Sequence, residues 1–174
     1  FDHDKLFEVT YQATVNLNDT ARVVFGLRYT EDEFSSDVTN FFGLQKYLIQ
    51  DELDETTGRL AFEMDMNEDT MVYVSYTKGF KPGGSNLTFG YPMDNEGFGA
   101  APAPQLIFPF FDSEMIDAYE LGMKSDFLDG RMRANISAFS YDYENLQFQS
   151  TDPDVYRGGV ANIPKSEMKG VELE

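Results

Sequence analysis

The sequence is dominated by an alternation of apolar and polar residues with a period of two, which recurs seven times along 174 residues. Within residues 5–17, for example, Val9 and Tyr11 alternate with Thr10 and Gln12. Successive side chains of a β-strand point to opposite faces, so each run predicts a strand with one apolar and one polar face. The predicted strands cover 5–17, 21–30, 58–67, 70–81, 115–127 and 131–149, and a seventh begins near Lys169.

The connections between these strands alternate strictly between tight and long. The tight ones lie at 18–20, 67–70 and 128–130, and the long ones lie near 34–57, 82–114 and 150–166. The pair Asp129-Gly130 is a strong signal for a hairpin turn. All seven prolines lie in the long connections or at their margins, so we expect none inside a strand, where the ladder needs every N–H.

This pattern predicts a membrane barrel. Outer-membrane barrels alternate short turns with long outer loops, and their strands need about ten residues to cross the bilayer. Aromatic residues near the long connections would form an interfacial girdle; they are Tyr29, Phe34, Phe80, Tyr141, Tyr143 and Phe148. We therefore predict an all-β fold, a segment of an antiparallel up-and-down transmembrane β-barrel. A soluble β-sandwich also alternates in this way and is the alternative.

The alternation also assigns each residue to a face of the barrel wall. The residues expected to face lipid are Leu60, Phe62, Met64, Leu121, Met123 and Ile136. Those expected to face the lumen are Arg59, Glu63, Glu120, Lys124 and Arg133.

The composition excludes several classes of function. There are 13 Lys and Arg against 31 Asp and Glu, a net charge of −18, whereas a nucleic-acid partner needs a basic face. The chain has no cysteine and one histidine, His3, which we expect in a surface loop. These counts argue against a thiol nucleophile and against zinc bound by Cys or His, so we predict no catalytic residue, metal site or cofactor, and no enzyme. No apolar run is long enough for a transmembrane helix.

The candidate ligand-binding residues are aromatic. Phe108, Phe110 and Phe111 surround Pro109 in the second long connection. Such a cluster can form a platform for a ligand at the mouth of a barrel, or it can pack against its own loop. Both interpretations remain open.

Two groups of carboxylates suggest other sites. Residues 51–55 contain four acids, which could hold a divalent cation or form a solvated acidic loop; the spacing of an EF-hand is absent, and we favour the loop. Glu63 and Asp65 share one face, and Arg59 nearby makes a charge network in the lumen the favoured role.

A glycine-rich stretch lies at the start of the second long connection. Gly79, Gly83 and Gly84 surround Lys81, but no Gly-Lys-Ser or Gly-Lys-Thr ending follows and Pro82 lacks a donor. We therefore expect these glycines to let the chain leave the barrel wall, and not to bind phosphate.

Five pieces of the sequence resemble, in order, the barrel of TonB-dependent outer-membrane receptors. They are Phe25-Gly-Leu-Arg-Tyr-Thr30, Met71 to Asn86, Tyr119-Glu-Leu-Gly-Met-Lys124 followed by Leu128-Asp-Gly-Arg131, Asn135 to Gln147, and Gly170-Val-Glu-Leu-Glu174. The resemblance spans nearly the whole chain.

The resemblance implies that residues 1–174 are part of a larger barrel of about 22 strands whose lumen holds a plug. Seven strands are about a third of that barrel, so we expect the plug domain, the segment that contacts TonB and the strand that closes the barrel to lie outside the chain.

The resemblance also implies a function, a location and partners. The function is energy-coupled uptake of a scarce solute such as an iron–siderophore, cobalamin or a carbohydrate, across the outer membrane of a Gram-negative bacterium. The implied partners are the TonB complex, reached through the plug, outer-membrane lipid and lipopolysaccharide, and a small-molecule ligand. A passive porin-like channel is the alternative, and a soluble β-rich binding domain is a third.

Overall fold

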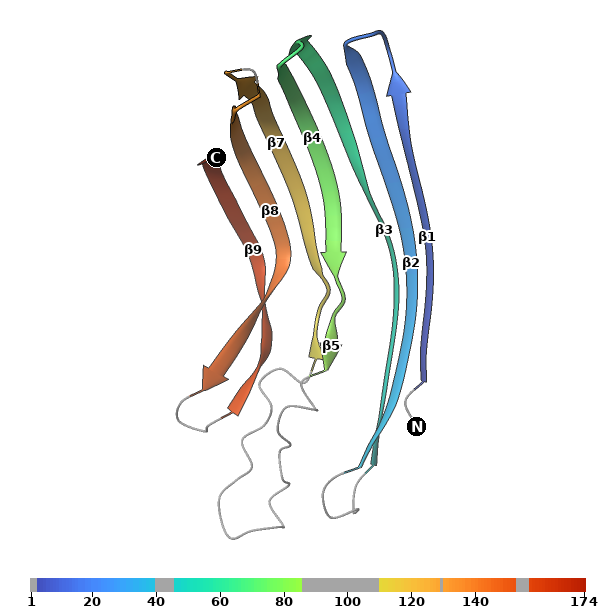
Figure 1. The fold of residues 1–174 in the computed structure, drawn as a ribbon. Coiled ribbons are helices and arrows are strands. Elements are labelled where there is room, and N and C mark those ends of the chain that lie inside the picture. Colours follow the sequence, from blue (N-terminus) through green and yellow to red (C-terminus); the bar gives the residue numbers. More distant parts are fainter. Residues whose placement is uncertain (1–2, 40–45, 86–109, 129, 153–156) are drawn as a thin grey trace.

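The computed structural model describes residues 3–39, 46–85, 110–128, 130–152 and 157–174 (Figure 1). Its strands are β1 (His3–Asn16), β2 (Ala21–Thr39), β3 (Lys46–Asn67), β4 (Thr70–Lys81), β5 (Gly84–Ser85), β6 (Phe110–Phe111), β7 (Glu114–Phe127), β8 (Met132–Asp152) and β9 (Arg157–Leu173). Among the described residues, no helix is long and apolar enough to cross a membrane.

Seven of these strands form one antiparallel sheet in the order β1-β2-β3-β4-β7-β8-β9, and β5 pairs with β6 separately. Strands that follow one another along the large sheet are neighbours, as in an up-and-down barrel wall (Figure 1). The seven predicted strands and their antiparallel order are therefore confirmed.

The register of the strands confirms the division into two faces. One row of cross-strand partners joins Val15, Val23, Phe62, Val74, Leu121, Ala138 and Val171. The next row towards the tight turns joins Ala21, Met64, Val72, Met123, Ile136 and Leu173. The residues predicted to face lipid thus share one face with these rows, and those predicted to face the lumen lie on the other.

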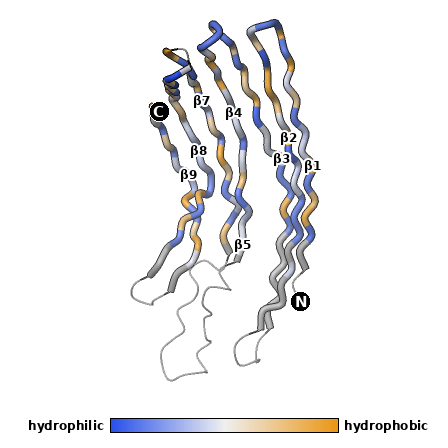
Figure 2. Tube along the Cα trace, viewed as in Figure 1, coloured by the Kyte–Doolittle hydropathy of each residue, from blue (hydrophilic) through white to orange (hydrophobic). Residues whose placement is uncertain are grey.

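The apolar face is not covered by a second layer in the described part of the chain. The buried residues of the described part of the chain, which lie on both faces, are all small: Ala21, Thr30, Thr57, Ala61, Ser75, Ser125 and Ala161. Large apolar side chains are exposed instead, such as Leu121 at 61% and Val171 at 73%. Figure 2 shows hydrophobic and hydrophilic residues interleaved along the strands of the sheet. A sandwich would bury this face against another sheet. A single layer with an apolar outer face is the form of a barrel wall in lipid.

The apolar outer stretches have the length of membrane-crossing strands. In β2 the outer-face positions of residues 21–29 are apolar, and Glu31 follows on the same face. In β7 the outer-face positions of residues 119–127 are apolar apart from Ser125, and Asp117 lies next to Tyr119 on the same face, on the side of the long connection. Each stretch therefore has about nine residues, which is enough for a tilted strand to span the bilayer.

These stretches also report the tilt of the strands. The register places Tyr119 level with Phe25, which is four residues short of Tyr29 in β2. Four residues correspond to about 13 Å along a strand, and the three strand spacings between β2 and β7 to about 14 Å. An apolar band parallel to the membrane then requires a tilt of about 40°, within the range of transmembrane barrels.

Two of the predicted long connections are much shorter in the structure. β2 continues to Thr39 and β3 begins at Lys46, so residues 40–45 replace the predicted connection 34–57. Similarly β8 ends at Asp152 and β9 begins at Arg157, well before Lys169. Beyond the membrane both faces of a strand meet water, and these extensions therefore carry no apolar alternation by which the sequence could reveal them.

The predictions for four residues are wrong. His3 begins β1, opposite Ser35, and does not lie in a loop. Pro164 lies inside β9, although we expected no proline within a strand. Tyr141 and Tyr143 share the polar face with Glu120 and so are not part of the outer girdle.

On the outer face, the aromatic border beside the charged residues includes Tyr29, Tyr76 and Tyr119. The ring centroids of Tyr76 and Tyr119 lie 5.1 Å apart, and the Tyr76 hydroxyl donates to Asp117 at 2.5 Å.

Candidate functional site

The polar face carries an ion-pair network near the tight-turn end of the sheet. Arg22 of β2 lies 2.7 Å from Glu63 Oε2 through Nε and 2.9 Å from Asp65 Oδ2 through Nη1. Both carboxylates come from β3, and Glu63 is the cross-strand partner of Arg22. The predicted lumen network therefore exists, but Arg22 holds it together and not Arg59.

A second cluster on the polar face is built around Tyr73 of β4. Its hydroxyl donates to Glu120 of β7, and the Lys124 ammonium lies 5.5 Å from the centroid of its ring. Gly122 lies directly opposite Tyr73, and an added Cβ there would overlap the ring. The Tyr73 ring therefore lies over backbone that no side chain covers, and it contacts both the Glu120 carboxylate and the Lys124 ammonium.

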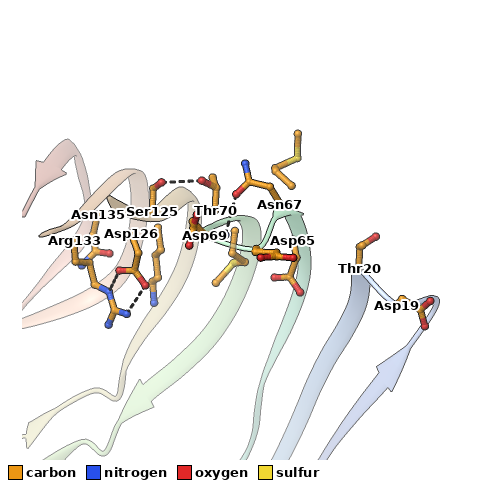
Figure 3. A pocket seen from close by; sticks show the side chains of 14 residues that line it. Asp19, Thr20, Asp65, Asn67, Asp69, Thr70, Ser125, Asp126, Arg133 and Asn135 are labelled. Carbon is orange, nitrogen blue, oxygen red and sulfur yellow. Dashed lines mark hydrogen bonds and ion pairs between the residues drawn. The ribbon is translucent and has the colours of Figure 1, made fainter. Parts of the chain in front are cut away.

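A hollow of about 730 Å³ opens at the tight-turn end (Figure 3). Among the charged side chains of its lining, the acids, such as Asp19, Asp65, Asp69 and Asp126, outnumber the two cations, Lys124 and Arg133. The hollow is open to solvent. It can therefore accept a polar protein surface more readily than an apolar small molecule.

Local contacts fix the rim of this hollow (Figure 3). The Arg133 guanidinium binds Asp126 through two bonds of 2.6 and 2.8 Å. The hydroxyls of Thr70 and Ser125 lie 2.7 Å apart and join β4 to β7. A two-pronged pair of this kind fixes geometry better than a single contact does.

At the opposite end, β2 and β3 form an acidic ribbon beyond the apolar rows. Lys5 Nζ lies 2.8 Å from Glu33 Oε2, and this hydrogen bond raises the pKa of the Lys5 ammonium. Arg28 Nη2 lies 2.6 Å from Glu8 Oε2 at the start of the ribbon. No group of three or more possible metal ligands gathers within the part of the chain that the structure describes.

The three candidate phenylalanines lie at the end of the second long connection. Phe108 lies outside the described residues, and Phe110 lies in β6, opposite Ser85. Phe111 is half-buried, and its ring covers Gly84 of β5. The geometry thus shows that Phe111 packs on its own loop; a role of the three residues in ligand binding stays a prediction.

The predicted glycine-rich stretch closes the base of the same connection. Gly83 N donates to Ser113 Oγ at 3.1 Å, and Gly84 pairs with Phe111. Gly79 lies within β4, opposite Ile116. These glycines allow the close approach of two chain segments.

Sequence reasoning missed two residues of this region, Gln147 and Asn162. Their side chains bind backbone atoms that lie between 17 and 66 residues away in the chain. An amide side chain in a strand carries no local signal for such partners, so only the assembled sheet could reveal them.

A family model, "TonB dependent receptor-like, beta-barrel", matches residues 6–174. The chain belongs to the TonB-dependent receptor family. This family is one of outer-membrane β-barrel transporters of Gram-negative bacteria, and not one of enzymes.

Individual relatives agree with this assignment. The chain is 26% identical over 162 residues to a ferric-pyoverdine 358 receptor of Pseudomonas putida, covering 91% of this chain. It is also 26% identical over 174 residues to the siderophore receptor PiuA of Acinetobacter baumannii, covering 96%.

Solved structures share the fold of this TonB-dependent receptor segment. The ferric yersiniabactin uptake receptor FyuA of Yersinia pestis superposes with a TM-score of 0.70 at 20% identity over 99% of the chain, and PiuA with a TM-score of 0.69 at 22%. The chain spans 18% and 22% of the two curated relatives and 24% of the FyuA chain.

Proposed function

We propose that the protein to which this segment belongs is a receptor that binds a ferric siderophore and imports it with energy from TonB. Relatives described as siderophore receptors support the substrate class. In this proposal residues 1–174 are part of the barrel domain. The plug, the TonB-contacting segment and the strand that closes the barrel are supplied by the rest of the protein.

The observation that carries the proposal is the division of one sheet into two unlike faces. A continuous apolar face crosses all seven strands, whereas the other face holds ion pairs such as Arg22–Glu63. Such a wall separates lipid from a polar lumen. The acidic hollow near Asp65 and Asp126 offers that lumen a surface to which a polar domain can bind.

Energy coupling follows from the affinity that scavenging requires. A ligand bound tightly enough to be captured at low concentration dissociates slowly, since affinity is set mainly by the off-rate. A plugged barrel also has no open path. Import therefore needs work, and we propose that TonB supplies it from the inner membrane.

The test uses radioactive ferric pyoverdine, yersiniabactin and alcaligin, which are named in the descriptions of a relative and of two similar solved structures. It measures their retention and uptake by cells that express the full-length receptor. At least one of the three should bind at the surface and enter, and deletion of TonB should stop entry while surface binding persists. Uptake that is unchanged without TonB and rises linearly with external concentration would instead establish a passive channel. Failure to bind any of the three would refute the siderophore class.

We further propose that Phe108, Phe110 and Phe111 contribute to the ligand platform. Because the Phe111 ring packs on Gly84, the test replaces the other two. Phe108→Ser with Phe110→Ser should weaken retention of the bound siderophore about tenfold, the effect of losing roughly 1.4 kcal/mol of contact. Unchanged retention would assign these rings to loop packing.

A further inference from the structure

The sheet divides near the long-connection end of β8. Pairing of β7 with β8 ends at Met115 and Glu144, and the next residue, Asn145, has a positive φ of 54°. In β9 the position opposite Asn145 is Pro164, which has no N–H for the ladder, and these two residues do not pair. β8 and β9 continue together as a separate ribbon (Figure 1).

Asn162 of β9 compensates for the interrupted ladder. Its Nδ2 donates to Asn145 O at 2.7 Å and to Asp112 O at 3.0 Å, while its Oδ1 accepts from Asp112 N at 2.7 Å. The Asn162 amide thus pairs with both backbone groups of Asp112, in the way a neighbouring strand would.

The Gln147 side chain of β8 donates hydrogen bonds to both ends of the β4–β7 connection. Its Nε2 donates to Pro82 O at 2.7 Å and to Asp112 O at 3.1 Å. Its backbone N–H donates to Glu114 Oε2 at 2.8 Å. Pro82 follows β4 and Asp112 precedes β7, so one amide joins the two places where this connection leaves and re-enters the wall.

Gln147 and Asn162 are cross-strand partners, so the two amides form one unit, which we name the loop-base clamp. We propose that the clamp fixes Pro82 and Asp112, the two ends of the β4–β7 connection, against the β8–β9 ribbon, and that this fixed base strengthens retention of a ferric siderophore. Gln147 and Asn162 are positioning residues in this account. The proposal rests on the proposed function only for the identity of what is held.

The test uses the full-length receptor in lipid, with nitroxide labels on cysteines at Asp19 and Asp112 as its only reactive cysteines. Only backbone atoms of Asp112 belong to the clamp, and Asp19 lies in the tight turn at the other end of the sheet. Spin–spin distance measurement then reports how well the connection is positioned, without any ligand.

Gln147→Glu and Asn162→Asp keep the size of each side chain and remove its donors. Gln149→Glu adds the same charge two residues further along β8, on an exposed side chain outside the clamp. We expect a narrow distance distribution in the parent and in Gln149→Glu, and a distribution at least twice as wide in the double variant. Gln147→Lys retains donors for the carbonyls and should stay narrow.

Equal widths in the parent and the double variant would overturn the clamp. If the Gln147→Lys distribution were as wide as that of Gln147→Glu, the clamp would not depend on hydrogen bonds donated by residue 147.

Binding is measured with radioactive ferric pyoverdine, yersiniabactin and alcaligin. The double variant should weaken retention about tenfold, and unchanged retention despite broadening would overturn the positioning role. If even the parent binds none of them, the proposed function fails, while the distances still decide the clamp.

Discussion

On the polar face, two glycines lie beneath aromatic rings. The Tyr73 ring covers Gly122, and the Phe139 ring covers Gly170. Each aromatic residue is the cross-strand partner of its glycine on the neighbouring strand. A glycine in a strand weakens it unless another group covers the bare backbone. The rings provide that cover, and Tyr73 in addition holds Glu120 through its hydroxyl.

Gly122→Ala tests this arrangement. The new methyl would displace the Tyr73 ring and break its bond to Glu120, so the full-length barrel should lose about 1–3 kcal/mol of stability. Gly26→Ala is the matched control, because its added Cβ would meet only Tyr11 O at 3.5 Å. Urea unfolding in lipid vesicles measures both. Equal losses in the two variants would contradict the account.

The face of a residue could be predicted from the sequence, whereas its partner could not. Arg59 and Glu63 are four residues apart in one strand, about 13 Å along it, which is too far for an ion pair. Arg22 is 41 residues from Glu63, yet the register places it directly opposite. The alternation of the sequence predicts which face a side chain lies on. Its partner on the next strand depends on the register, which only the paired strands reveal.

At the scale of the strand, the bilayer sets how much of each element the sequence reveals. β2 has 19 residues and β3 has 22, about twice what crosses a membrane. The membrane-crossing parts alternate and could be predicted. The outer extensions are rich in charged and polar residues, and their few apolar residues, such as Leu48 and Leu53, do not form a regular alternation. They therefore resemble loops in sequence although they are paired in the structure.

A matched pair of substitutions in β8 tests the assignment of faces. Ala138 lies on the apolar face between Leu121 and Val171, and Ser137 lies on the polar face opposite Glu172. Ala138→Arg should cost about 2–4 kcal/mol because it places a cation in lipid. Ser137→Arg should cost much less, since water and a carboxylate are near. Folding yield into vesicles and unfolding in urea measure the difference. A larger loss of stability in Ser137→Arg than in Ala138→Arg would show that the two faces are assigned wrongly.

For the molecule as a whole, the sheet makes sense only as part of a closed wall. β1 and β9 are its two edges, and the large apolar side chains of the described residues lie mainly exposed on one face. A free edge invites pairing with another chain, and closure removes it. Strand order and faces could be predicted from alternation and turn lengths. The loop-base clamp could not, because it depends on where three distant segments meet.

The most direct test is a nitroxide scan of residues 60–65 in the full-length protein in lipid bilayers. Collision with oxygen, which concentrates in lipid, should be high at Leu60, Phe62 and Met64 and low at Ala61, Glu63 and Asp65. The register that pairs Phe62 with Val23 and Val74 predicts this period of two and its phase. A profile without alternation, or with the opposite phase, would contradict the barrel wall described here.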